Sequence, residues 1–322
     1  MKKMIHCFAA GCVSLWLLAV SVSANRLLVP VGELIGLQVQ NQTVTVAGFD
    51  GSTGNNAESA GLEKGDVLLK INETTIGCVE DVRRALSRSD GSVQILVQRQ
   101  DTTHTVQLQP RITNDGPRLG VYLKQGITGV GTVTWYDPDT DAFGALGHGI
   151  NTQTHTLADM AQGSAYRAGV MSVKKGQPGD PGQLMGTIRD AQPIGTLTKN
   201  TQQGVFGHAP DAFSGQELPV ADSDDIEKGP ATIVSTVAGE TPREYSVEIL
   251  KIYPTAAASG RNMLLRVTDS ALLEATGGIV QGMSGSPIIQ DGQLVGAVTH
   301  VLVNDPTTGY GIFIENMLDA AA

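Results

Sequence analysis

"GIVQGMSGSPIIQDGQLVGAVTH", residues 278–300, is the stretch that decides the fold and points to a site. Ser284 stands between glycines, and Pro287 then leads into a hydrophobic run. Glycine permits tight turns and close approach of another molecule, and Asp291-Gly292 is a typical hairpin turn. The stretch therefore predicts a tight turn that presents a hydroxyl, followed by two paired strands.

The chain around this stretch has the pattern of an all-β domain. With 39 glycines, 14 prolines and 4% aromatic residues, the 322-residue sequence is rich in turns. From Arg118 onward, short apolar runs alternate with glycine, proline and aspartate, at the spacing of a barrel or sandwich. The one helix predicted here is "DSALLEAT", residues 269–276, because two glycines end it. We expect residues 118–322 to form one mainly β domain.

Residues 25–110 predict a smaller α+β domain. Alternating apolar and polar residues indicate strands, and "CVEDVRRALSRSDG", residues 78–91, has helical spacing with Val79, Val82 and Leu86 on one face. A terminal strand pair follows. Residues 111–117, "RITNDGP", are polar and turn-rich and predict a linker.

Residues 1–24 predict a signal peptide or a membrane anchor. Two lysines precede an apolar stretch, and Val22-Ser23-Ala24 fits the small-residue rule for cleavage. About 20 mostly apolar residues could also span a bilayer uncleaved, so both alternatives stay open. In either case we expect export across, or anchoring to, the cytoplasmic membrane.

Charge and cysteine content narrow the possible partners. The net charge of −10 argues against nucleic acid. Cys7 and Cys12 lie in the leader, which leaves Cys78 alone and predicts no disulfide within the mature chain.

The serine turn has the features of a nucleophile site. A reactive hydroxyl must project from a tight turn, and backbone amides beside it must converge on the oxygen of the group it attacks. We expect Ser284 to be the nucleophile and the N–H groups of Gly282 and Ser284 to form the oxyanion hole. Ser286 is a second serine in the same motif.

A serine nucleophile needs a base, and histidine is the usual one near neutral pH. His148, in "ALGHGI", is flanked by two glycines that leave its ring accessible. His300 is the main alternative, because it ends the strand that follows the serine turn. Lys251 and Lys199 offer a weaker serine–lysine alternative, since no Ser-x-x-Lys pattern stands at the turn.

Asp269 is the candidate carboxylate for orienting the histidine. It stands directly before the predicted helix, however, where aspartate is a common N-cap. The two roles are compatible, and from spacing alone the cap is favoured. Scattered histidines predict no metal site, and we expect no cofactor.

"ESAGLEKGDVLLKINETTI", residues 58–76, resembles a PDZ domain. Such domains add an extended peptide as a strand to a sheet edge and hold a terminal carboxylate in a loop of N–H groups. By position this peptide-binding loop would be Leu34, Ile35, Gly36 and Leu37. A plain hairpin entry is the alternative.

Residues 276–318 and 129–150, together with the PDZ-like domain, resemble the SpoIVB peptidase family of spore-forming bacteria. The resemblance implies a serine peptidase with a PDZ domain and a trypsin-like, double-barrel catalytic domain. It implies a triad at His148, Asp269 and Ser284. It also implies self-cleavage and the cleavage of a membrane-associated regulatory protein between forespore and mother cell during sporulation. A catalytically silent PDZ-type binding protein is the alternative.

Overall fold

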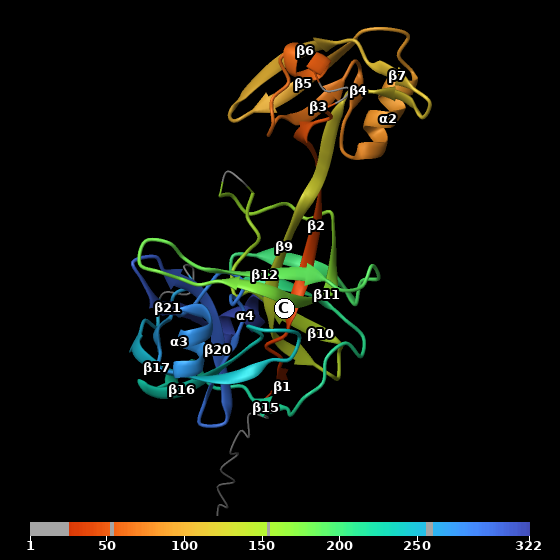
Figure 1. Ribbon diagram of the computed structural model, residues 1–322. Helices are drawn as coiled ribbons and strands as arrows, with labels where there is room; N and C mark the ends of the chain where they lie inside the picture. Colours follow the sequence, from red (N-terminus) through yellow and green to blue (C-terminus); the bar gives the residue numbers. More distant parts are fainter. Residues whose placement is uncertain (1–25, 52–54, 153–154, 256–259) are drawn as a thin grey trace, which may run out of the picture.

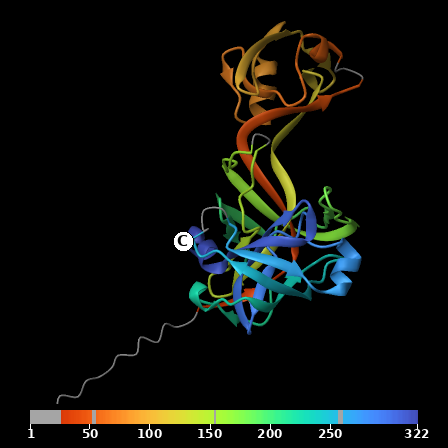
Figure 2. The ribbon, with the colours of Figure 1, turned by 90° about the vertical axis from the view of Figure 1, so that its left-hand side faces the viewer.

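Two long antiparallel strands organise the molecule, β2 (Leu34–Phe49) and β9 (Val121–Asp137). A computed structural model describes residues 26–322 except 52–54, 153–154 and 256–259. β2 and β9 pair from Leu34↔Thr132 to Phe49↔Val121. One end of the pair lies in a larger lower body and the other end in a smaller upper body, so the two strands form an arm between them (Figures 1 and 2).

The upper body is an α+β domain built on the far end of this arm. Its sheet has the order β9-β2-β3-β5-β6. The predicted helix is confirmed as α2, with Val82 and Leu86 buried. The elements are α1 (Asn55–Ser59), β3 (Val67–Ile71), β4 (Thr74–Thr75), α2 (Val79–Ser87), β5 (Val93–Arg99) and β6 (Thr102–Leu108).

The lower body begins with a six-stranded barrel in which β2 and β9 are neighbours. The ring runs β9-β10-β14-β13-β11-β2 and closes through the β2–β9 pairing. Phe143, fully buried, lies in its core. The further strands are β10 (Ala142–Ala145), β11 (Gln162–Lys174), β13 (Gly195–Thr201) and β14 (Gly204–His208), with β12 (Gln183–Ile188) paired to β11 outside the ring.

The second barrel contains the serine turn. It is closed in the order β16-β17-β18-β21-β20-β19, and the predicted hairpin at Asp291-Gly292 joins β19 to β20. The mainly β, double-barrel fold is therefore confirmed. The elements are β16 (Gly229–Ser235), β17 (Arg243–Ile252), β18 (Met263–Val267), α3 (Ser270–Thr276), β19 (Pro287–Gln290), β20 (Gln293–Leu302), β21 (Asp305–Phe313) and α4 (Ile314–Ala321). A short connection between the barrels holds β15 (Leu218–Pro219) and η1 (Ser223–Asp225).

The domain boundary predicted at residue 25 is wrong. β1 (Leu27–Pro30) pairs with β9 and β15, and most of the buried hydrophobic residues from Val29 to Val39 belong to the core of the first barrel. The core of the upper body starts only at Val44. The chain thus enters the lower body, crosses to the upper body along β2 and returns along β9.

The linker predicted at residues 111–117 is instead a small hairpin. β7 (Arg111–Thr113) and β8 (Gly116–Arg118) pair with each other, and β8 lies against α2. Turn-forming residues such as Asp115 and Gly116 serve a hairpin as well as a linker. The connection between the two bodies is therefore the paired arm of β2 and β9.

The predicted leader, residues 1–24, lies outside the described residues. Within the part of the chain that the structure describes, no helix combines the length and the apolar character needed to cross a membrane.

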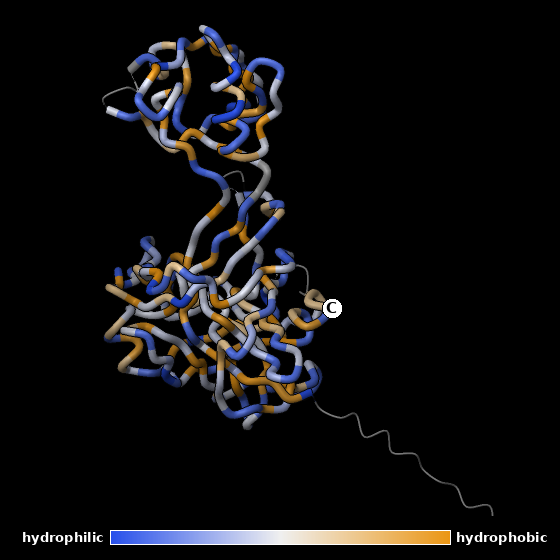
Figure 3. Tube along the Cα trace, turned by 90° about the vertical axis from the view of Figure 1, so that its right-hand side faces the viewer, coloured by the Kyte–Doolittle hydropathy of each residue, from blue (hydrophilic) through white to orange (hydrophobic). Residues whose placement is uncertain are grey.

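Each body has its own hydrophobic core, and hydrophobic segments run through both bodies in Figure 3. Leu68, only 1% exposed, packs in the core of the upper body. We expect Leu68→Ala to destabilise that body by about 2–5 kcal/mol through lost burial and a cavity. Hydrogen exchange followed by mass spectrometry should then show faster exchange in β3 and β5, with β10 unchanged. Equal acceleration in β10 would contradict separate cores.

Candidate functional site

The serine turn is held by strand β9 of the other barrel. The Thr132 amide donates to the Ser284 carbonyl (3.0 Å), and its hydroxyl donates to the Gly282 carbonyl (2.8 Å). The buried Thr134 hydroxyl donates to the Gly285 carbonyl (2.8 Å). Gly285 has φ +97°, and a Cβ there would lie 2.0 Å from the Thr132 carbonyl oxygen. Only glycine fits this position, so the turn and the strand are matched in shape as well as in hydrogen bonding.

Of the two serines in the motif, only Ser284 faces the site. Its half-buried hydroxyl donates to the carbonyl of Thr299 (2.8 Å). Ser286 is fully buried, and its hydroxyl donates to Ser235 Oγ (2.9 Å). The hydroxyl that a substrate could reach is therefore that of Ser284.

The amides predicted for the oxyanion hole lie in this turn. Neighbouring amides are engaged, with the Met283 N–H donating to Val280 (3.1 Å) and the Ser286 N–H to Met283 (3.0 Å). Among the hydrogen bonds between described residues, none uses the N–H of Gly282 or Ser284. Both donors are thus available, and their role as an oxyanion hole stays a prediction.

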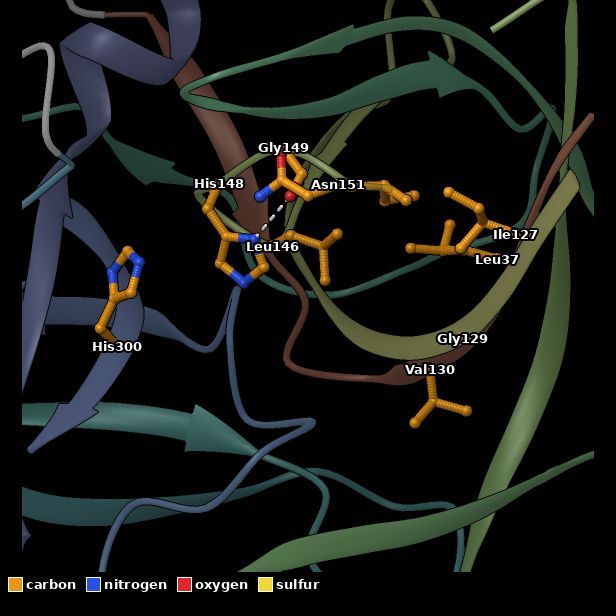
Figure 4. A pocket seen from close by; sticks show the side chains of 10 residues that line it. Leu37, Ile127, Gly129, Val130, Leu146, His148, Gly149, Asn151 and His300 are labelled. Atoms are coloured by element: carbon orange, nitrogen blue, oxygen red, sulfur yellow. Dashed lines mark hydrogen bonds between the residues drawn. The ribbon is translucent and has the colours of Figure 1, made fainter. Parts of the chain in front are cut away.

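His148 reaches the same place from the first barrel. It follows β10 at a sharp turn, in which Leu146 and Gly147 have φ of 71° and 68°. A Cβ on Gly147 would lie 2.8 Å from Thr299 Cγ2, so the chain beside His148 packs on the residue that accepts the Ser284 hydroxyl. The two barrels therefore bring His148 and Ser284 into one neighbourhood. His148 Nδ1 contacts the Gly149 carbonyl at 3.0 Å (Figure 4).

His300, the alternative base, lies beside His148. The two ring centroids are 5.6 Å apart, and both rings border the same cavity in Figure 4. His300 Nδ1 is buried without a hydrogen-bond partner among the described residues. The imidazole of His300 is thus close enough to influence His148 directly.

Both imidazoles favour the neutral form. Burial lowers the pKa of His148 below its ordinary value of 6.5, and the contact with the Gly149 carbonyl opposes this in part. Burial, His148 and Arg261, in that order, lower the pKa of His300 to about 4. A neutral imidazole is the form that accepts a proton, so the site is prepared for general-base chemistry near pH 7.

A cavity of about 340 Å³ adjoins His148. One wall comes from β2 and β9, and the other from the segment that follows β10. Apart from the two histidines and Asn151, its lining side chains are apolar, and they are Leu37, Ile127, Val130, Leu146 and Ile150 (Figure 4). An uncharged side chain of a bound peptide would fit this environment.

Asp269 is the N-cap of α3, which confirms the interpretation as a helix cap. Its carboxylate accepts from the amides of Leu272 (2.9 Å) and Ser246 (3.4 Å). Leu264 and His300 both pair with Tyr310. At about 3.3 Å per residue, Asp269 lies on the order of 15 Å farther along the chain than Leu264. The structure therefore does not place Asp269 beside the histidines, and its role in orienting His148 stays a prediction.

The two lysines considered as alternative bases are engaged elsewhere. Lys199 Nζ donates to the Ala321 carbonyl (2.8 Å), and Lys251 Nζ lies 4.7 Å from the centre of the Tyr253 ring. Neither contact involves the serine turn. Histidine is therefore the better candidate base.

The peptide-binding loop predicted at Leu34, Ile35, Gly36 and Leu37 is wrong. These residues lie inside β2, which pairs with β9 on one edge and β11 on the other. A Cβ on Gly36 would meet Ile188 at 2.7 Å. No free sheet edge exists there, because the apolar alternation belongs to a barrel strand.

The upper body has a different edge that fits strand addition. The residues of β9 from Val121 to Gln125 pair with β2 on one side. On the other side α2 approaches, since the Val79 amide donates to Gln125 Oε1 (3.3 Å). The segment Leu119-Gly120, together with Val121 at the start of β9, turns at Gly120, which has φ +76°. This apolar-Gly-apolar triplet before a strand is the sequence signal for the loop, but it lies after the PDZ-like motif and within the domain predicted for residues 118–322.

No group of three or more His, Cys, Asp or Glu side chains within the described ranges could hold a metal ion.

Comparison with known proteins agrees with this architecture. Residues 115–318 match the family model described as SpoIVB peptidase S55, and residues 50–99 match a PDZ domain. A curated protein of Rhizobium meliloti, named "Putative zinc metalloprotease R01501", is 29% identical over 125 residues. That alignment covers 38% of this chain and 31% of the relative, so the chain spans about a third of the relative's length.

Among solved structures, the chain is similar to the Rv3671c protease of M. tuberculosis. For the active form the sequence identity is 15%, the TM-score is 0.37, and the match covers 61% of this chain and 75% of the other. For the inactive form of the Rv3671c protease the sequence identity is 15% and the TM-score is 0.35, and the match covers 59% of this chain and 82% of the other. The family match extends over more than half of the sequence and includes both the histidine and the serine turn. The chain belongs to the SpoIVB peptidase S55 family and contains a PDZ domain.

Proposed function

We propose that this chain is a serine endopeptidase with Ser284 as nucleophile and His148 as general base. The observation that carries the proposal is that Thr299 accepts the Ser284 hydroxyl while its side chain packs on Gly147, the neighbour of His148, across the junction of the two barrels. Neither barrel alone supplies both groups. The turn and the strand end that present them are fixed by hydrogen bonds or close backbone packing.

The reaction would begin with a change at the serine. The Ser284 hydroxyl leaves the Thr299 carbonyl by rotation about χ1 and donates instead to the imidazole of His148. As the oxygen attacks the peptide carbonyl carbon, His148 takes the proton. The amides of Gly282 and Ser284 stabilise the oxyanion, at about 3 kcal/mol for each donor. The imidazolium then gives its proton to the leaving amine, and water releases the acyl group by the reverse sequence.

Two hypotheses remain for the group that orients His148. By family resemblance it is the Asp269 carboxylate, which would have to give up its contacts with α3 and β17. The alternative is the Gly149 carbonyl, which already lies 3.0 Å from His148 Nδ1. A carbonyl can fix the ring and its tautomer, but it supplies less charge than a carboxylate.

The PDZ domain would select the substrate. Its available edge at β9 suits an extended peptide, and the loop at Gly120 suits a terminal carboxylate. Family membership supports a membrane-associated regulatory protein, and the enzyme itself, as substrates. It also supports action outside the cytoplasmic membrane, between forespore and mother cell, during sporulation.

The alternative is a catalytically silent protein in which only the PDZ domain binds. The neutral histidines and the accessible Ser284 hydroxyl favour the enzyme, because a purely structural loop needs neither.

Ser284→Ala tests the nucleophile. We expect the variant to lose labelling by a fluorophosphonate, self-cleavage and peptide hydrolysis, with a rate loss of at least about 10⁴-fold. Gel-based labelling and mass spectrometry of the chain's N-terminus measure these effects. Ser286→Ala is the matched control and should still be labelled. Unchanged hydrolysis in Ser284→Ala would end the proposal.

The lowered pKa of His148 predicts the acid limb of the pH–rate profile. Because burial keeps the imidazole neutral, the base persists below pH 6.5 and is lost only as the pH falls through the lowered value. We expect kcat/KM to be constant from neutral pH down to that limb. A steady-state profile on one peptide, with enzyme stability checked at each pH, measures it. A limb at or above pH 7 would contradict burial as the controlling factor.

Asp269→Asn separates the two roles of Asp269. Asparagine caps helices about as well as aspartate, so we expect the stability to change by only a few tenths of a kcal/mol, whereas Asp269→Ala should lose about 1 kcal/mol. Thermal unfolding measures this difference. With the fold preserved, a loss of about 10⁴-fold in kcat would assign the carboxylate to His148. Full activity would assign Asp269 to the cap alone.

A further inference from the structure

One edge of β9, between the PDZ domain and the catalytic site, lacks a partner strand among the strands that the structure describes. Among the strands that the structure describes, β2 pairs with one edge of β9 along its whole first part. The other edge is paired only from Val133 onward, by β10. Between Val121 and Gly131, no strand in the described part of the chain pairs with that edge, which α2 approaches through the hydrogen bond from the Val79 amide to Gln125 Oε1. At about 3.3 Å per residue, this free edge is roughly 35 Å long.

Burial separates the two parts of the strand. Every residue of β9 from Val121 to Val130 is half-buried or exposed, whereas residues 131–137 are all buried. The change occurs at the site itself, because the next residue, Thr132, holds the serine turn. An extended polypeptide could therefore approach the edge until it reaches Ser284.

Near the site, backbone N–H and C=O groups of β9 face away from β2, toward the edge without a described partner strand. The Thr132 amide donates to Ser284 and its carbonyl accepts from the Leu146 amide, so both groups of Thr132 face away from β2. Since backbone groups alternate along a strand, those of Val130 and Thr128 face the same way. They are placed to pair with a substrate beyond its scissile bond, at the wall of the cavity that Val130 lines.

The two ends of the edge fix the direction of the substrate. The loop suited to a terminal carboxylate, Leu119-Gly120-Val121, stands at the N-terminal end of β9. A peptide whose C-terminus lies there runs antiparallel to β9, and its upstream part then extends toward Ser284. The segment on β9 is therefore the leaving group of the reaction.

We propose that the substrate is one extended polypeptide that pairs along this edge, with its C-terminus at Leu119–Val121 and its scissile bond at Ser284. The length of the arm then fixes the distance between the substrate's C-terminus and the bond that is cut, and we call this hypothesis the ruler. Gly126, with φ +82°, interrupts the regular strand, and pairing on either side of it between Val121 and Gly131 places the cut about ten residues from the substrate's C-terminus. The inference rests on the proposed peptidase function and specifies its substrate as a protein or peptide with a free C-terminal tail.

A digest of a bacterial lysate, made with a glutamate-specific protease, provides probes of many lengths with free C-termini. After incubation with the full chain, mass spectrometry measures the length of each new C-terminal fragment. We expect fragments of about 8–12 residues to be enriched roughly tenfold over shorter and longer ones, because tethering raises the local concentration of one bond. A flat length distribution would overturn the ruler.

The carboxylate is tested on the best-cleaved peptide from that experiment. We expect its C-terminal amide to be cleaved at least about fivefold more slowly, because the loop loses a charged acceptor for its N–H groups. Equal rates for acid and amide would overturn the placement of the C-terminus. This comparison uses the unmodified protein and does not depend on the folding of a variant.

Thr128→Pro tests the edge itself. Proline removes an amide that faces away from β2, and edge strands tolerate this change. We expect the variant to lose the length preference, whereas Thr128→Ala should keep it. A length preference that survives in folded Thr128→Pro, as judged by circular dichroism, would overturn the pairing along β9.

Labelling of Ser284 by a fluorophosphonate distinguishes failure of the ruler from failure of the proposed peptidase function. If the wild-type chain is labelled and cleaves peptides without a length preference, the peptidase function stands and the ruler fails. If it is neither labelled nor active, the proposed function fails.

Discussion

The hydrogen bonds from β9 to the serine turn are the interaction on which the rest of the structure depends. Thr132 and Thr134, both fully buried, donate hydrogen bonds to the carbonyls of Gly282, Ser284 and Gly285. Buried donors and acceptors are costly to leave unpaired, so this set aligns the two barrels closely. Among the hydrogen bonds between described residues, none uses the amides of Gly282 and Ser284. A turn from one barrel thus becomes a site only when a strand of the other barrel holds it.

Burial, more than any polar contact, keeps the two histidines of the site in the neutral form. His148 and His300 face each other at 5.6 Å, and burial keeps both pKa values below the ordinary one. Two imidazolium ions at this distance would repel each other, so the neutral pair is the stable state near pH 7. Burial therefore preserves the proton acceptor, while Ser284 as a residue is only half-buried. The contacts of Asp269 lie with α3 and β17, away from this pair.

The PDZ domain is joined to the catalytic body by paired strands. β2 and β9 each contribute to the core of both bodies, so the arm is a continuation of two sheets. A paired arm holds two sites at a more constant separation than a flexible linker does. Only such a connection makes a fixed distance between peptide capture and cleavage physically reasonable. The order of elements, with the lower body entered first and completed last, follows directly from it.

The sequence by itself determined the local features of this protein: the turn at Ser284, the glycines around His148, the hairpin at Asp291-Gly292, the helix α2 and the cap at Asp269. Each depends on the conformational preferences of a few adjacent residues, which act over one turn or hairpin. Only the tertiary structure decided which strand edges are paired. Residues 34–37 alternate like an edge strand, yet neighbours on both sides bury them, whereas the free edge belongs to β9. Pairing is set by partners far apart in the chain, and no local pattern of side chains records it.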